Sequence, residues 1–430
     1  MYVQPTVRSS YVDDMVVFAK LSHCAAGRVS ARSLREYKRA LSCVFQRCNS
    51  TSTHTKHNKQ SQHPQPLILQ HHLFEHQSIF PMAISDLVLL TGGTGYIGSR
   101  TLRYALEQGY HVRAAVRSQA KADAVRNSPA LKGLTDKLDF VIVPDFLASG
   151  AFNEAIKGVK YAVHLASPLA KGTIDEDLDA KIIQPAVQGA VEMLEAAKKE
   201  STVKKVVITS SAVALPPVAV LGGQQRTDQV FTTTDRAHDI PGPYPATFVA
   251  YIQSKIASLK AVDAWVQKHG SEIDFDVITI LPGFVGGRSD NATNVAELLD
   301  GTNFWFLAPV LGKEAAKNAG SQVANTVHVD DVAKAHIESL SDKMTGNQSF
   351  ILSNQGGEMQ WNDSKAIVSK HFPEAVKSGL LPNDGVIEEH FFMSCDNQST
   401  VKAFGELKSF EEIIPGLVEQ YLELQAQEKK

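Results

Sequence analysis

Tyr251 and Lys255 are the residues in this chain best suited to moving a proton. They lie four positions apart in a segment with helical apolar periodicity, so both side chains are expected on one face of a helix. A phenol with the ordinary pKa of about 10 exchanges protons poorly at neutral pH. Because a nearby ammonium group favours the phenolate and lowers that pKa, the pair predicts a tyrosine that acts as a general acid or base.

Two serines follow a short apolar segment and offer partners for this tyrosine. Val206–Thr209 is typical of a buried strand, and Ser210 and Ser211 come directly after it. Ligands of open α/β sheets bind at the carboxyl ends of the strands. Either hydroxyl could donate a hydrogen bond to a substrate oxygen that gains negative charge. The alternative is that both serines only cap the strand end.

The segment Thr91–Gly98 is rich in glycine and lies between an apolar strand and a helix. Its glycines, Gly92, Gly95 and Gly98, permit a tight turn and leave bare backbone for a pyrophosphate at the positive end of the helix. Tyr96 and Ile97 lie in the same turn and are expected to contact the ligand. The flanking strand and helix favour a dinucleotide-binding turn over a merely structural one.

The end of the next strand indicates which dinucleotide is bound. An acidic residue there would bind the ribose 2′-hydroxyl of NAD, but the strand ends in Arg117, and Lys121 follows. Arg117 is a cation where a 2′-phosphate would lie, so the sequence favours NADPH. The alternative is that Arg117 is a solvated surface arginine.

Alternating strands and helices surround these motifs. Strands are predicted at 87–91, 111–116, 140–143, 161–165, 206–209 and 275–280, and helices at 96–108, 178–199 and 251–267. This alternation predicts the α/β class, with a doubly wound parallel Rossmann sheet. We expect a dinucleotide-binding domain at 82–282. A smaller, mainly substrate-binding region is expected at 283–430, with some segments returning to the sheet.

Composition limits the possible partners. The chain has 430 residues, a formal net charge of -3 and four cysteines without a CxxC pair. These values give no reason to expect nucleic acid or membrane as a partner. The cysteine pattern is typical of a reducing compartment, so a cytoplasmic location is predicted.

Residues 1–81 differ from the rest of the chain. They are polar, rich in histidine and poor in apolar periodicity, which predicts a disordered and dispensable extension. Without a repeated ligand spacing, the histidines do not favour a metal site. Scattered arginines leave a mitochondrial presequence as the alternative, although acidic residues interrupt them. Met82 stands a few residues before the first strand and is the expected start of the enzyme, which favours a wrongly assigned upstream start codon over a cleaved presequence.

The chain from Leu87 to about Leu424 resembles the extended short-chain dehydrogenases/reductases, the NAD-dependent epimerase/dehydratase superfamily. It is most similar to the branch that contains dihydroflavonol reductase, cinnamoyl-CoA reductase and the methylglyoxal reductases. The matching stretches include TGGTGYIG at 91–98, VVITSSA at 206–212, AYIQSK at 250–255 and HVDDVAKAHI at 328–337.

The resemblance assigns further residues. It implies that Ser211, Tyr251 and Lys255 are catalytic, with Lys255 also holding the nicotinamide ribose. The remaining expected cofactor contacts are Asp145 and Phe146 at the adenine, Ala166 and Ser167 at the ribose, and Pro282 and Val285 at the nicotinamide. Gln188 and Gly283 depart from the family pattern, which puts a solvent relay and the nicotinamide wall in doubt.

The resemblance implies NADPH-dependent reduction of a ketone or aldehyde to an alcohol, by a monomer or homodimer acting on a small-molecule carbonyl substrate. Two alternatives stay open. One is an epimerase or dehydratase of nucleotide sugars with tightly held NAD. The other is a cofactor-binding regulator without turnover, which intact Tyr251 and Lys255 argue against.

Overall fold

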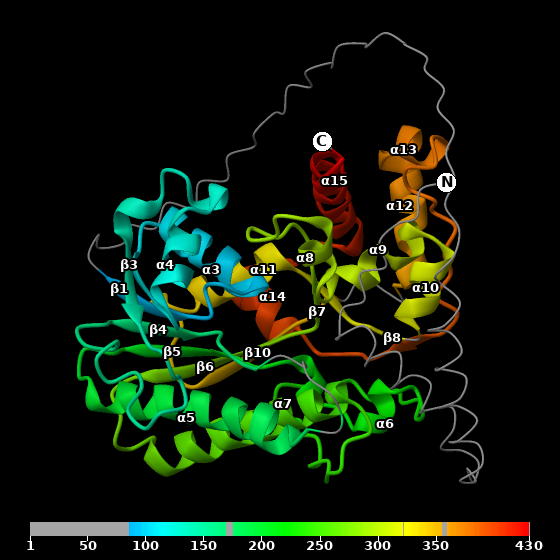
Figure 1. Cartoon of the computed structure of the whole chain (residues 1–430). Coiled ribbons are helices and arrows are strands. Elements are labelled where there is room, and N and C mark those ends of the chain that lie inside the picture. The colour runs from blue at the N-terminus through cyan, green and yellow to red at the C-terminus, as the bar shows by residue number, and fades with distance from the viewer. Residues whose placement is uncertain (1–85, 169–173, 175, 321, 355–358, 430) are drawn as a thin grey trace. The chain divides into compact units, whose positions relative to one another are not determined.

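A seven-stranded parallel sheet forms the centre of the protein (Figure 1). The structure is a computed structural model that describes residues 86–168, 174, 176–320, 322–354 and 359–429, which fall within one compact unit. The strand order is β10-β6-β5-β4-β1-β2-β3. The strands are β1 (Leu87–Thr91), β2 (His111–Val116), β3 (Leu138–Ile142), β4 (Tyr161–His164), β5 (Lys205–Thr209), β6 (Asp276–Pro282) and β10 (Gln348–Leu352).

The strand order reverses between β1 and β4. From β1 the chain runs outward through β2 to β3, then returns to place β4 on the other side of β1. The central strands β1, β4 and β5 are apolar and almost wholly buried, as expected for parallel strands covered on both faces. A reversal of this kind opens a crevice beyond the carboxyl ends of the strands, where open α/β sheets bind ligands.

Helices cover both faces of the sheet (Figure 1). Helices α5 (Gln184–Lys199) and α7 (Thr247–His269) pack together on one face, with a π-helical turn at Asp179–Ile183 before α5. Helices α3 (Tyr96–Glu107), α4 (Gln119–Arg126) and α11 (Val329–Glu338) lie on the other. The doubly wound α/β prediction is therefore confirmed, and six of the seven strands agree with their predicted ranges to within about two residues.

The chain after residue 282 contributes both to the sheet and to a separate group of short elements. β10 pairs with β6, and α11 packs on α3. Strand β7 (Phe284–Gly286) pairs with β9 (Thr326–His328), and β8 (Gln322–Ala324) pairs with β11 (His390–Phe392). The remaining helices are α6 (Val218–Leu221), α8 (Val295–Leu299), α9 (Asn303–Leu311), α10 (Lys313–Ala319), α12 (Ser364–His371), α13 (Pro373–Lys377), α14 (Gln398–Phe404) and α15 (Phe410–Glu428).

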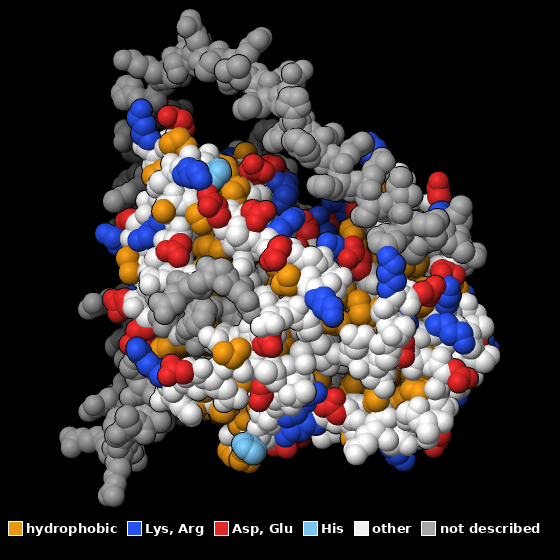
Figure 2. Space-filling model, turned by 180° about the vertical axis from the view of Figure 1, so that it is seen from behind, with side chains coloured by type: hydrophobic (Ala, Val, Ile, Leu, Met, Phe, Trp, Pro, Cys, Tyr) orange, Lys and Arg blue, Asp and Glu red, His pale blue; other side chains and the backbone are white. Residues whose placement is uncertain are grey.

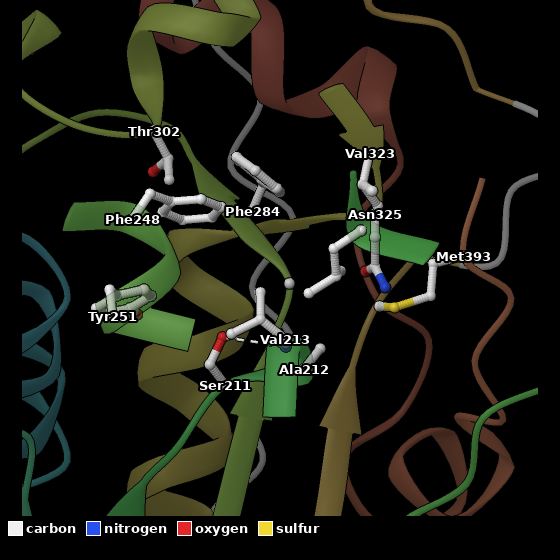
Figure 3. Close-up of a pocket in the computed structure, with 12 residues that line it drawn as sticks. Ser211, Ala212, Val213, Phe248, Tyr251, Phe284, Thr302, Val323, Asn325 and Met393 are labelled. Atoms are coloured by element: carbon white, nitrogen blue, oxygen red, sulfur yellow. Dashed lines mark hydrogen bonds between the residues drawn. The ribbon is translucent and has the colours of Figure 1, made fainter. Parts of the chain in front are cut away.

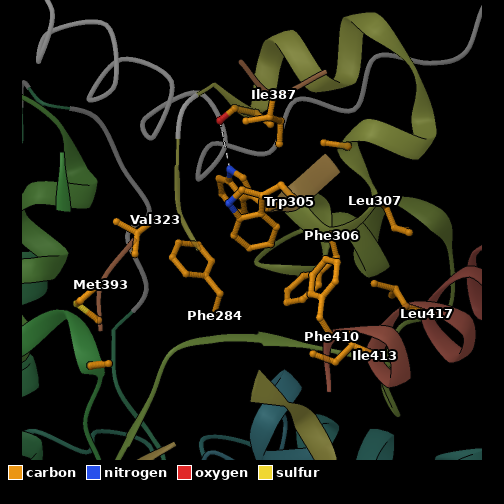
Figure 4. Close-up of a cluster of buried hydrophobic side chains, with 14 of the residues drawn as sticks. Phe284, Trp305, Phe306, Leu307, Val323, Ile387, Met393, Phe410, Ile413 and Leu417 are labelled. Carbon is orange, nitrogen blue, oxygen red and sulfur yellow. Dashed lines mark hydrogen bonds between the residues drawn. The ribbon is translucent and has the colours of Figure 1, made fainter. Parts of the chain in front are cut away.

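An aromatic cluster holds the C-terminal elements together (Figure 4). Trp305 and Phe306 of α9 are fully buried. The Phe306 ring lies 5.2 Å from Trp361 and 5.7 Å from Phe410, between ring centroids. Trp305 and Phe306 are enclosed by other side chains, so they belong to the core and not to the wall of a pocket.

The surface carries both signs of charge. On the face in Figure 2, acidic and basic side chains are interspersed with small groups of apolar ones. None of the helices in the described part of the chain combines the length and apolar character that a bilayer span requires. The predictions for residues 1–81, including the histidine-rich segment, lie outside the described residues.

Candidate active site

A pocket lies beyond the carboxyl end of β5, where α7 passes the strand (Figure 3). It has a volume of about 430 Å³, part of it open to solvent. The lining residues are Ser211, Ala212, Val213, Leu221, Phe248, Tyr251, Gly283, Phe284, Thr302, Val323, Asn325 and Met393. Apolar side chains therefore form most of the wall, and two hydroxyls from the predicted site stand on one side.

Ser211, rather than Ser210, faces this pocket. Its side chain lines the pocket together with Tyr251, and its hydroxyl accepts from the Val213 amide at 3.4 Å as the N-cap of the short 3-10 helix Ala212–Ala214. Ser210 instead extends the sheet, because its backbone N–H donates to Ile280 at 2.7 Å. Of the two serines that the sequence left open, the structure brings Ser211 to the tyrosine.

Tyr251 and Lys255 lie on α7, as their spacing predicts. The Lys255 ammonium is 5.5 Å from the centroid of the Tyr251 ring and donates to the Ser167 hydroxyl at 2.9 Å. The Tyr251 ring stacks on Phe248, with centroids 5.9 Å apart. This helix therefore supplies the phenol, its ammonium neighbour and an apolar wall of the pocket.

Burial sets the protonation of this pair. It raises the pKa of Tyr251 to about 12, although the neighbouring Ser211 hydroxyl acts against the rise. Burial also lowers the pKa of Lys255 to about 8. The expectation that Lys255 lowers the tyrosine pKa is not met in the protein alone, because burial raises that pKa. Tyr251 is therefore a protonated phenol at neutral pH, which is the form that donates a proton.

Glycine is needed in the turn before α3 for two different reasons, close packing at two positions and space for a ligand at the third. A Cβ on Gly92, whose φ is +77°, would lie 2.8 Å from the Ala166 nitrogen, and one on Gly98 would lie 2.0 Å from the Gly92 oxygen. Close packing of the protein itself requires these two. A Cβ on Gly95 would meet only the Gly92 oxygen, at 3.4 Å. Its absence leaves room in front of the turn for a ligand.

The N-terminus of α3 suits an anion. Among the described residues, no side chain caps this helix at Gly95, and its first turn carries no acidic residue. The backbone amides of Tyr96 and Ile97 stand at this positive end. The Tyr96 hydroxyl turns elsewhere and donates to the Gly287 carbonyl at 2.9 Å. The turn therefore fits the phosphates of a dinucleotide, with Tyr96 contributing its backbone.

The predicted adenosine contacts lie at the ends of neighbouring strands. Arg117 follows β2, is exposed, and lies with its guanidinium carbon 5.9 Å from the Phe146 ring centroid. Lys121 is exposed in the first turn of α4. Asp145, directly before Phe146, accepts a hydrogen bond from the Leu147 amide at 2.9 Å. The structure thus places two cations, an aromatic ring and a carboxylate at one edge of the sheet.

The residues expected at the ribose and the nicotinamide lie beside Lys255 or directly next to residues that line the pocket. The Ala166 amide donates to Thr91 at 3.2 Å, which fixes the loop that carries Ser167 beside Lys255. Pro282 ends β6 and Val285 lies in β7; both are buried, while their neighbours Gly283 and Phe284 line the pocket.

The structure shows the surroundings of Gly283 and Gln188, the two residues that depart from the family pattern. A Cβ on Gly283 would lie 2.3 Å from Asn325 Oδ1, so glycine is required where β7 approaches Asn325. Gln188 is exposed, and its amide donates to the Leu147 carbonyl. It therefore lies near the adenosine contacts rather than beside Tyr251.

Several lining residues were not predicted from the sequence. Phe248 could have been, since it precedes Tyr251 by one helical turn. Thr302, Val323, Asn325 and Met393 come from separate segments after residue 282. No local pattern marks these four residues. Pairings of distant strands bring Val323, Asn325 and Met393 to the pocket, and Thr302 lies at the N-terminus of α9.

The family follows from comparison with known proteins. Residues 88–352 match the NAD dependent epimerase/dehydratase family. The chain belongs to this family. It is 39% identical over 350 residues to a ketoreductase of Cercospora nicotianae, covering 79% of this chain and 96% of that protein. It is 36% identical over 262 residues to an NAD-dependent epimerase/dehydratase of Alternaria alternata, covering 59% and 72%.

Solved structures share the fold. Yeast methylglyoxal/isovaleraldehyde reductase complexed with NADPH has a TM-score of 0.65 at 22% identity, over 79% of this chain and 99% of that chain. Vestitone reductase from alfalfa has a TM-score of 0.59 at 25% identity, over the same shares. As a member of the epimerase/dehydratase family with ketoreductase relatives, the protein is an oxidoreductase that binds a nicotinamide dinucleotide.

Proposed function

We propose that this protein reduces a ketone or aldehyde to the alcohol, with NADPH as the hydride source. One observation carries the proposal: Ser211 and Tyr251 line the same, mostly apolar pocket, and the phenol is protonated at neutral pH. A carbonyl oxygen placed between them would find two donors. The ketoreductase relative of Cercospora nicotianae supports the same reaction.

The chain offers a binding site for each part of the dinucleotide. Gly92, Gly95 and Gly98 would receive the pyrophosphate at the N-terminus of α3, and Lys255 would hold the nicotinamide ribose. Arg117, with Lys121 nearby, favours the 2′-phosphate of NADPH. When bound, the reduced nicotinamide supplies the hydride that the protein itself lacks.

The protein's own residues bind the carbonyl oxygen and donate the proton. Ser211 and Tyr251 donate hydrogen bonds to the carbonyl oxygen, which stabilises the negative charge that develops there. Tyr251 then gives its proton to that oxygen, and the Lys255 ammonium stabilises the phenolate left behind. The apolar walls exclude water and orient the substrate.

The pocket favours a reductase over an epimerase of nucleotide sugars. Most of its lining is apolar, including Val213, Leu221, Phe248, Phe284, Val323 and Met393. A sugar would need many polar partners, whereas an apolar ketone or aldehyde needs them only at its carbonyl oxygen. The exposed Arg117 at the end of β2 also favours NADPH over the NAD of that alternative.

A substrate screen tests the proposal. Purified protein is mixed with NADPH or NADH and a panel of aliphatic and aromatic ketones, aldehydes and a UDP-sugar, and dinucleotide oxidation is followed by absorbance. We expect oxidation of NADPH with apolar carbonyls and formation of the matching alcohols. Conversion of the UDP-sugar without net dinucleotide oxidation would contradict the proposal.

A further inference from the structure

A short segment after β7 joins the C-terminal elements to the glycine turn. We name Gly287–Asn291 the clasp segment. It lies between β7 and α8, and side chains of α9 and α15 hold it from one side. On the other side it contacts Thr94 in the turn and the first turns of α3.

Two side-chain amides fix the backbone of the clasp segment. Asn303 accepts from the Gly287 N–H at 3.1 Å and donates to the Gly287 carbonyl at 3.0 Å. Gln420 does the same for Ser289, with both hydrogen bonds at 2.7 Å. All four of these hydrogen bonds are buried, so the segment has one defined conformation on the C-terminal side.

An ion-pair cluster fixes the segment to α3. The Asp290 carboxylate lies 3.0 Å from Arg100 Nε and 3.5 Å from an Arg103 nitrogen, and its side chain is only 8% exposed. The Tyr96 hydroxyl adds a hydrogen bond to Gly287 at 2.9 Å. The helix that begins at the turn is therefore tied to the clasp segment by three side chains.

Asn291 reaches the turn itself. Its amide Nδ2 donates to the Thr94 carbonyl at 2.8 Å, and its Oδ1 accepts from the Ser289 hydroxyl at 2.7 Å. The orientation of this amide follows from chemistry, because the Thr94 carbonyl can only accept. Thr94 directly precedes Gly95, whose missing Cβ leaves room for the ligand.

We propose that the clasp segment holds the glycine turn in the conformation that receives the pyrophosphate, and that Asn291 is a positioning residue for dinucleotide binding. The inference rests on the proposed use of this turn. The pyrophosphate is common to NADPH and NADH, so loss of the Asn291 contact weakens the binding of both dinucleotides equally. A change at Arg117, by contrast, acts through the 2′-phosphate alone.

Direct binding of the dinucleotide tests this role. Wild type, Asn291→Ala and Asn291→Asp are titrated with NADPH and with NADH, without a carbonyl, by quenching of protein fluorescence. Asn291 is exposed, so both variants should fold, and melting without dinucleotide checks this. Asp has the shape of Asn and still accepts from Ser289, but it places an oxygen against the Thr94 carbonyl. Thr293→Ala, which removes an exposed bond to Glu297 in the adjoining stretch, is the matched control.

Both Asn291 variants should bind NADPH and NADH about five- to tenfold more weakly, the size expected for one hydrogen bond. Their melting temperatures should stay close to that of wild type, and Thr293→Ala should bind like wild type. If Asn291→Asp bound the dinucleotides with wild-type affinity, the proposed role of the clasp segment would be wrong, but the proposed reductase function would still stand. A wild-type protein that binds neither dinucleotide would overturn both.

Discussion

At the scale of single residues, Lys255 determines how the rate of the proposed reaction depends on pH. Burial lowers its pKa to about 8, while that of Tyr251 is raised to about 12. The ammonium that stabilises the phenolate is therefore lost first as pH rises. We expect kcat/KM for carbonyl reduction to be level below about pH 8 and to fall above it. A rate that stays level to pH 10 in a pH–rate profile would contradict this role of Lys255.

Arg117 determines the choice of dinucleotide in the proposed function. Arg117→Asp replaces a cation by an anion at the place of the 2′-phosphate, so NADPH affinity should fall at least about tenfold while NADH use holds or rises. Arg126→Asp is the matched control, because Arg126 is also exposed and lies 5.0 Å from an aromatic ring, that of Phe140. The ratio of kcat/KM for the two dinucleotides measures the effect. An unchanged preference in Arg117→Asp would show that another group recognises the phosphate.

At the scale of elements, the glycines in the strand–turn–helix unit β1–α3 have different roles: Gly98 is needed for packing, and Gly95 for binding of the dinucleotide. Gly98→Ala would force a Cβ to 2.0 Å from the Gly92 oxygen, whereas Gly95→Ala meets nothing closer than 3.4 Å. Gly98→Ala should therefore lower the free energy of unfolding by about 1–3 kcal/mol or more. Gly95→Ala should unfold like wild type but bind NADPH at least about tenfold more weakly. Thermal melts and dinucleotide titrations of both variants check this, and tight NADPH binding by Gly95→Ala would argue against a pyrophosphate at the turn.

The same elements show how far the sequence could be read. Local patterns are sufficient where one strand or helix carries the signal, as for the glycine turn, the strand before Ser211 and the Tyr251–Lys255 helix. They missed β10, which follows a long stretch of short elements and enters the sheet only by pairing with β6. They also missed Asn325 and Met393, because the pairings β7–β9 and β8–β11 connect residues far apart in sequence. The rise in the Tyr251 pKa was missed because burial cannot be read from spacing.

At the scale of the whole molecule, buried histidines limit stability in acid. Burial lowers the pKa of His164, His328 and His336 to about 4. His336 shows why: its Nδ1–H donates to the Val332 carbonyl and its Nε2 lies 2.7 Å from the Thr209 hydroxyl, so the neutral ring is already satisfied. Because the folded pKa values are depressed, this stability is present above about pH 6.5, the unfolded pKa, and is lost as pH falls toward 4.

The loss should be roughly 1 kcal/mol per pH unit for each imidazole within that range. Urea unfolding of the wild-type protein at half-unit steps from pH 7 to pH 4.5 measures it. A free energy of unfolding that does not change over this range would contradict the assignment of three neutral, buried histidines.

The central claim is that Tyr251 protonates a carbonyl oxygen while its carbon receives a hydride from NADPH. The most direct measurement uses NADPH deuterated at the transferred position and the best carbonyl substrate from the screen. It compares wild type, Tyr251→Phe and Tyr244→Phe. The last variant is the control, because the wild-type Tyr244 hydroxyl donates to Asp179 instead. We predict one deuterium on the new carbinol carbon, a rate lower by about 10²–10⁴ in Tyr251→Phe, and a normal rate in Tyr244→Phe. An alcohol without deuterium, or an undiminished rate in Tyr251→Phe, would contradict the claim.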